Sequence, residues 1–199
     1  MRSKGVIALV VVALLLGLAG CGAVSSYNTL VRADEQVSTA WANVETQYQR
    51  RADLIPNLVE TVQGAADFEQ ETLQSVTEAR AKATSIQVRP EDLNDPQKLQ
   101  QFQQAQSALG QSLGRLLAVS ENYPQLQATQ SFSDLQAQLE GTENRIAVAR
   151  RDYNNAVRSY NTTVRSFPTV LFASVMGFNS KAAFEAEEGA QDAPDVNFD

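Results

Sequence analysis

Apolar residues recur every three or four positions along most of the chain, the spacing that gathers them on one face of a helix. The pattern predicts four helices, with residues 27–51, 56–85, 96–123 and 131–167 as their ranges. The last of these would be roughly 50 Å long at about 1.5 Å per residue. Helices of this length are typical of an elongated antiparallel four-helix bundle, and we therefore predict an all-α fold.

Proline marks the expected end of the first helix. Pro56 cannot donate a hydrogen bond to the carbonyl oxygen of Ala52, and it disfavours helical geometry in the residue before it. We therefore expect a turn, or at least a sharp kink, between Arg51 and Pro56. Asp53 would then cap the second helix.

Polar residues are expected to cap the later helices. Residues 86–94 read as a connector, since Pro90 blocks continuation of a helix. Asp95 followed by Pro96 predicts the start of the third helix. Ser131 or Ser133 would cap the fourth.

A heptad repeat dominates the last predicted helix. Residues 152–158 read DYNNAVR and residues 159–165 read SYNTTVR, so that Tyr, Asn, Val and Arg each recur after seven positions. A similar hexad, YNTLVR, occupies residues 27–32. Matching stripes on the first and last helices are what two neighbouring helices of a bundle need.

The repeat leads into residues 167–178, which are apolar and uncharged. Four antiparallel helices place the start of the first and the end of the fourth at the same end of the bundle. One hypothesis is that this segment lies in the lipid interface or binds a membrane-protein partner there, through Phe167, Phe172, Met176 and Phe178. The alternative is that the segment covers the open bundle end and buries Phe172 and Met176, since twelve residues are too few to span a bilayer.

The N-terminus has the form of a secretory signal peptide over residues 1–20, with basic residues followed by an apolar stretch. Leu18-Ala19-Gly20-Cys21 resembles the bacterial lipobox, in which the cysteine is acylated and becomes the first residue. Residues 21–26 would then be a lipidated tether, held firmly because two or three acyl chains bind better than one. An uncleaved membrane helix over residues 6–24 is the alternative.

Both interpretations tether the domain to a membrane, facing the periplasm or the cell exterior. Gly22 after the cysteine leaves sorting to the inner or the outer membrane undetermined. Residues 27–178 would form the bundle, and residues 179–199 an acidic tail whose composition predicts disorder.

Charge and composition exclude several functions. The net charge is −7, and removal of residues 1–20 with their two basic groups leaves 14 basic against 23 acidic groups, or −9. Such a domain repels nucleic acid. Histidine is absent and Cys21 is the single cysteine, which excludes the common zinc sites and histidine-assisted nucleophiles. We therefore expect neither an enzyme nor a metal or other cofactor.

Two hypotheses for function remain. The first is a scaffold or adaptor that is tethered to the membrane and presents its faces to an envelope protein. The second is a small-ligand binder or enzyme that uses polar groups inside the bundle, for example Asp34 with Tyr153 or Tyr160. Polar groups within a bundle also set helix register, which favours the first hypothesis.

Several runs resemble the LemA family, in the order that the family has. They are Tyr27-Asn28-x-Leu30-Val31, Ala40-Trp41, Arg50-Arg51-x-Asp53-Leu54-Ile55-Pro56-Asn57-Leu58-Val59, Glu78-Ala79-Arg80, Arg151-x-Tyr153-Asn154, Tyr160-Asn161, Phe167-Pro168 and Gly177-Phe178. The resemblance implies a membrane-attached four-helix bundle outside the cytoplasm, in a family whose biochemical function is largely unassigned. This chain departs from the family at Ala65 and Phe68, where relatives often carry Tyr and His, and at the lipobox, where many relatives have a membrane helix.

The run from Arg50 to Pro56 has two interpretations. As a tight turn, it would use Pro56 for the break, Asp53 for free amides, and Arg50 and Arg51 for terminal carbonyls. As a recognition surface far from the membrane, the same four residues would bind another envelope protein.

Overall fold

A computed structural model describes residues 2–64 and 69–185 of the chain. The fold is all-α, as predicted. Its elements are α1 (Arg2–Gln63), α2 (Gln70–Ser85), the 3₁₀ helix η1 (Pro90–Asn94), α3 (Pro96–Ser120), α4 (Pro124–Gln127), α5 (Gln130–Arg165) and α6 (Val170–Ala173).

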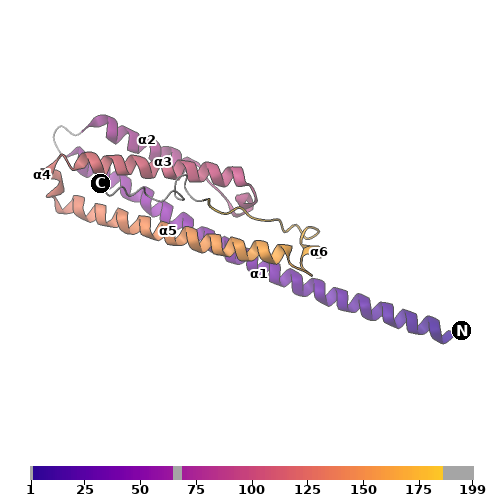
Figure 1. The fold of residues 1–199 in the computed structure, drawn as a ribbon. Helices are drawn as coiled ribbons and strands as arrows, with labels where there is room; N and C mark the ends of the chain where they lie inside the picture. Colours follow the sequence, from indigo (N-terminus) through magenta and orange to yellow (C-terminus); the bar gives the residue numbers. More distant parts are fainter. Residues whose placement is uncertain (1, 65–68, 186–199) are drawn as a thin grey trace, which may run out of the picture.

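Two pairs of antiparallel helices build the bundle. Helix α5 packs along α1, and α3 packs along α2 (Figure 1). The N-terminal part of α1 projects beyond the other helices, while α4 closes the opposite end (Figure 1). The elongated antiparallel arrangement predicted from the helix lengths is therefore confirmed.

Helix α1 does not turn at Pro56, and this prediction was wrong. The helix continues to Gln63, and the next helix, α2, begins at Gln70. Ile55 and Leu58 are buried, so the apolar stripe runs through the proline without interruption. The carbonyl oxygen of Ala52, which Pro56 leaves without its helical donor, accepts a hydrogen bond from the Nε atom of Arg80 in α2 at 2.8 Å. This contact offsets part of what proline costs a helix interior.

The predicted caps have mixed outcomes. Asp95 caps α3 as expected, because its carboxylate accepts from the backbone N–H of Gln97 at 2.9 Å. Asp53 caps nothing, because it lies within α1 and accepts from the Gln49 side chain at 2.7 Å. Ser131 and Ser133 also lie inside their helix, since α5 begins at Gln130.

The core consists of two parts, which we call the aromatic core and the aliphatic core. The aromatic core lies toward the end from which α1 projects, with Trp41 packed edge-on against Phe102 and Tyr153 at centroid distances of 5.5 and 5.3 Å. The aliphatic core lies toward α4 and includes Ile55, Leu58, Leu109, Leu116 and Phe132.

Three buried polar residues separate the two cores: Arg51 of α1, Gln106 of α3 and Thr142 of α5. Each lies in its helix between residues of the aromatic core and residues of the aliphatic core. A buried polar layer of this kind sets the register of neighbouring helices.

The C-terminal end of α5 lies beside α1, at the end of the bundle from which α1 projects, as expected from the topology. Helix α6 lies there (Figure 1), and the ring of Phe178 packs edge-on against Tyr27 at 5.9 Å. Packing does not stop at Phe178, where the bundle was expected to end. Residues 179–185 follow the bundle surface, with Lys181 and Phe184 buried. The remainder of the predicted tail lies outside the described residues.

Candidate functional site

Exposed apolar side chains gather at the α6 end of the bundle. Phe167 is 80% exposed, Leu171 60% and Val175 88%, and Val170 is also exposed. We call these four residues the α6 surface. Residues 166–180 contain no charged group, so the surface is apolar without a charge of its own.

This surface only partly matches the residues proposed from sequence. Phe167 is exposed as expected, while Phe172, Met176 and Phe178 are half-buried. Phe178 packs on Tyr27, and so part of the segment does cover the bundle end. The more exposed Leu171 and Val175 were missed, although their spacing of four residues places them on one face of a helical turn.

Helix α1 contributes further apolar groups near this end. Val24 is 63% exposed and Tyr27 47%. Cys21 lies in α1 six residues before Tyr27, about 9 Å along the helix axis at 1.5 Å per residue. Across the described ranges, 2–64 and 69–185, no helix has the length and hydropathy needed to cross a membrane.

The structure divides the four residues of the proposed recognition surface. Arg50, Asp53 and Pro56 are exposed on the outer side of α1, whereas Arg51 is buried. The two adjacent arginines therefore lie in different environments. One side chain faces solvent, and the other faces the polar layer between the two cores.

Arg51 connects three helices. Its Nη1 donates to Glu143 Oε1 in α5 at 2.7 Å, and its Nη2 donates to the side-chain oxygen of Gln106 in α3 at 2.6 Å. The guanidinium also lies 5.1 Å from the centre of the Tyr48 ring. A planar group with several fixed donors suits such a junction better than a lysine would.

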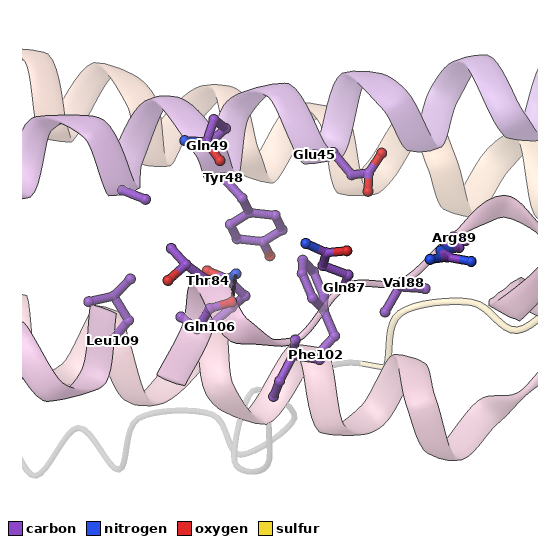
Figure 2. Close-up of a pocket in the computed structure, with 13 residues that line it drawn as sticks. Glu45, Tyr48, Gln49, Thr84, Gln87, Val88, Arg89, Phe102, Gln106 and Leu109 are labelled. Carbon is purple, nitrogen blue, oxygen red and sulfur yellow. Dashed lines mark hydrogen bonds between the residues drawn. The ribbon is translucent and has the colours of Figure 1, made fainter. Parts of the chain in front are cut away.

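A cavity of about 270 Å³ lies beside this layer, between α1, α3 and the connector after α2. Figure 2 shows Glu45 and Tyr48 of α1 facing Gln106 and Phe102 of α3, with Gln87 from the connector. Burial raises the pKa of Glu45. A second cavity of similar volume lies on the other side of Tyr48 and Gln106, lined also by Glu143 and Arg150.

The groups that line these cavities can form hydrogen bonds with a small polar molecule. The one hydroxyl drawn in Figure 2 besides that of Tyr48 belongs to Thr84, and it donates to the carbonyl oxygen of Arg80 at 3.0 Å, inside its own helix. The Thr84 hydroxyl is therefore not hydrogen-bonded to a side chain that could act as a base.

Within residues 2–64 and 69–185, no three acidic or sulfur-bearing side chains gather in a way that could hold a metal.

Asp34, Tyr153 and Tyr160 are engaged with the chain's own residues. Asp34 Oδ1 lies 2.9 Å from Lys181 Nζ, and this ammonium lies 5.4 Å from the centre of the Tyr160 ring. The hydroxyl of Tyr153 donates to the carbonyl oxygen of Ala182 at 2.8 Å. Lys181 was missed in the sequence because it follows the predicted end of the bundle.

Burial governs the ionisation of both tyrosines. It raises the pKa of Tyr160 to about 12, with a further contribution from the negative charge of Asp34. It also raises the pKa of Tyr153. Both phenols are therefore held neutral as hydrogen-bonding or packing groups.

Comparison with known proteins gives the chain its relatives. The model of a family described as "LemA family" matches residues 40–198. Magnetosome protein MamQ 2 of Paramagnetospirillum magneticum is 29% identical over 184 residues, covering 84% of this chain and 67% of the relative. Protein LemA of Metamycoplasma hominis is 26% identical over 161 residues, covering 81% and 69%. The lipobox-like residues precede the range that the family model matches.

Proposed function

Because this chain belongs to the LemA family, we propose that it is a membrane-anchored extracytoplasmic lipoprotein and a non-catalytic scaffold or adaptor of the bacterial cell envelope. Acyl chains on Cys21 hold it to the membrane. The bundle stands on its α6 end and presents its sides to an envelope protein.

One observation carries this proposal: α1 projects from the same end of the bundle that bears the α6 surface (Figure 1). The contact of Tyr27 with Phe178 fixes this end about 9 Å from Cys21 along α1. Lipid attached at Cys21 therefore brings Leu171 and Val175 to the level of the lipid headgroups.

Apolar contact is the form of membrane contact that suits this domain. The chain carries more acidic than basic groups, so anionic lipid headgroups repel it. Electrostatic attraction between a basic patch and the membrane is therefore not the basis of its attachment. Each large apolar side chain gains about 1.5–3 kcal/mol when it is fully buried, and partial insertion gains a fraction of this. The α6 surface thus orients a bundle whose attachment depends on the acyl chains.

The outer side of α1 is the proposed surface for a protein partner. Arg50, Asp53 and Pro56 are exposed there, away from the contacts of the bundle. Asp53 lies 32 residues beyond Cys21, about 48 Å along α1. A partner that binds this surface is held well clear of the bilayer.

The contacts of the polar groups invoked for a ligand binder or enzyme support the scaffold instead. Asp34 and Tyr153 bind Lys181 and Ala182 of the same chain. In this structure both groups are occupied by residues of the same chain, whereas the alternative of a ligand binder or enzyme requires them to face a small ligand.

Intact mass spectrometry after growth with an alkyne-labelled palmitate tests the anchor. We expect the wild type to begin at Cys21 and to carry the label, and Cys21→Ser to accumulate as a larger unlabelled precursor that keeps residues 1–20. A wild-type protein that keeps residues 1–20 and lacks the label would contradict the lipoprotein.

Photo-crosslinking in the native cell tests the scaffold. A photoreactive residue at Arg50 or Asp53 should give a discrete adduct with an envelope protein, and Val148, an exposed position on α5, serves as the control. Adducts that are the same at all three positions, or absent at all three, would refute the partner surface.

A further inference from the structure

Residues 181–185 lie extended along the bundle, and side-chain amides of α5 bind their backbone. Asn161 Nδ2 donates to the carbonyl oxygen of Lys181 at 2.9 Å, and its Oδ1 accepts from the N–H of Lys181 at 2.8 Å. Asn154 makes the same pair of bonds with Phe184, at 3.0 and 2.9 Å. Each asparagine thus pairs with one residue as a neighbouring strand would.

Residues from other elements complete the pairing. Gln103 of α3 repeats the pattern with the backbone of Glu185, at 3.0 and 3.3 Å. The N–H of Ala182 donates to the carbonyl oxygen of Leu93 at 2.8 Å, and its carbonyl oxygen accepts from Tyr153. We call the channel formed by these donors and acceptors the amide groove. These groups bind the backbone of the segment from side chains that the helices α3 and α5 carry and from the carbonyl oxygen of Leu93.

The spacing of the two asparagines matches an extended peptide. Asn154 and Asn161 are one heptad apart, about 10.5 Å along a helix. Lys181 and Phe184 are three residues apart, about 10 Å along an extended chain. The repeated Tyr-Asn pair, which sequence analysis explained only by helix pairing, therefore also places two equivalent amides beside two residues of the segment that are three positions apart.

Two side-chain sites accompany the amide groove. Phe184 is buried, stacked on Trp41 at 5.9 Å and edge-on to Tyr153 at 5.4 Å, with the guanidinium of Arg150 4.8 Å from its centre. Lys181 occupies the other site, where its ammonium pairs with Asp34. Of the two alanines between them, Ala182 is partly buried and Ala183 is exposed, and neither has a site of this kind.

We propose that the amide groove is a recognition site for extended peptides with the pattern Lys-x-x-Phe. The chain's own residues 181–185 occupy it in this structure, and a matching peptide from another chain binds in their place. Backbone pairing supplies affinity for an extended chain, while the aromatic site and Asp34 select the side chains. The donors and acceptors come largely from α3 and α5, so they keep their places when the segment leaves.

Because the chain's own segment occupies the amide groove, a free peptide must displace this segment in order to bind. A segment joined by a short linker competes at an effective concentration in the millimolar range. A free peptide should therefore bind weakly to the wild type, and more tightly when the internal Phe184 anchor is removed. This difference distinguishes an exchangeable site from a permanent part of the core.

The test measures binding of a fluorescein-labelled peptide with the sequence of residues 179–187, NSKAAFEAE, to the full lipidated chain in nanodiscs. We expect Phe184→Ser to bind at least tenfold more tightly than the wild type. A second substitution, Asn154→Ala, should abolish the gain, and a scrambled peptide should not bind. Phe184→Ser that binds no better than the wild type, or that binds the scrambled peptide equally, would overturn the proposal.

A charge exchange gives a second, independent test that keeps the aromatic anchor in place. Lys181→Glu places a carboxylate against Asp34 and should also raise affinity for the free peptide. Asp34→Lys in the Phe184→Ser chain should reverse the preference, so that the peptide with Glu in place of Lys binds several-fold more tightly than the original. An unchanged preference would refute the assignment of Asp34 as the group that reads the lysine.

Discussion

Arg80 donates a hydrogen bond from Nε to the carbonyl oxygen of Ala52, 28 residues earlier in the chain, at 2.8 Å. This oxygen is the one that Pro56 leaves without a donor in α1. The contact explains how a helix passes through a proline and joins α1 to α2 at the same point. It also connects two runs that appeared separate in the sequence, Arg50–Pro56 and Glu78–Arg80.

A double-mutant cycle measures this connection. Arg80→Ala should lower the free energy of unfolding by about 1–2 kcal/mol, because it leaves a helix carbonyl without its partner. In a Pro56→Ala background the same substitution should cost about 1 kcal/mol less, since the introduced alanine supplies the missing N–H. Urea unfolding followed by circular dichroism gives all four values, and equal costs in both backgrounds would show that the two residues are not coupled.

The adjacent arginines should behave differently. Arg51→Ala removes a buried side chain that donates to the buried Gln106 and to the half-exposed Glu143, and should lower the free energy of unfolding by about 2 kcal/mol. Arg50→Ala, at an exposed position, should change it by less than about 0.5 kcal/mol. Thermal unfolding of the two variants side by side makes the comparison, and similar melting temperatures would contradict the structural role of Arg51.

Tyr160 should make the protein sensitive to alkali. Its folded-state pKa is raised to about 12, above the ordinary value of 10.0, so folding favours the neutral phenol. Its contribution to stability is complete below about pH 10 and is lost as the pH rises toward 12. Ionisation would also place a phenolate beside Asp34, although Lys181 faces both groups.

Urea midpoints at several pH values test this expectation. Tyr160→Phe should decline less steeply than the wild type between about pH 10 and 12, because the substituted ring cannot ionise. Tyr27→Phe, at a half-exposed ring, is the matched control and should follow the wild type. A decline of the same steepness in Tyr160→Phe would rule out this tyrosine as the cause.

Local sequence patterns were sufficient for the architecture. The three- and four-residue periodicity predicted an all-α bundle, and Asp95 with Pro96 located the start of α3. The continuation of α1 through Pro56 could not be predicted from the sequence, because the rule for proline assumes that the freed carbonyl stays unpaired. Here a tertiary contact from Arg80 supplies the donor, and no local pattern reveals it.

Long-range contacts also limited prediction of the sites. The acidic composition after Phe178 predicted a tail, yet Lys181 and Phe184 are buried by partners that lie more than 20 residues away, among them Asp34 and Trp41. The apolar segment was recognised as a unit from its lack of charge. Which of its residues are exposed could not be predicted, because this depends on the packing of Phe178 against Tyr27, which buries one side of the segment.

The orientation of the bundle on the membrane is the central claim, and lipid quenching of a fluorophore measures it. Val175, 88% exposed in the α6 surface, and Ala128, exposed beside α4 at the opposite end, would each be replaced by cysteine and labelled. In the proposed lipoprotein, acylation of Cys21 would keep that thiol from reacting. In vesicles with a headgroup-attached quencher, the label at 175 should be quenched several-fold and the label at 128 should be unaffected. Equal quenching at both positions, or stronger quenching at 128, would contradict the account.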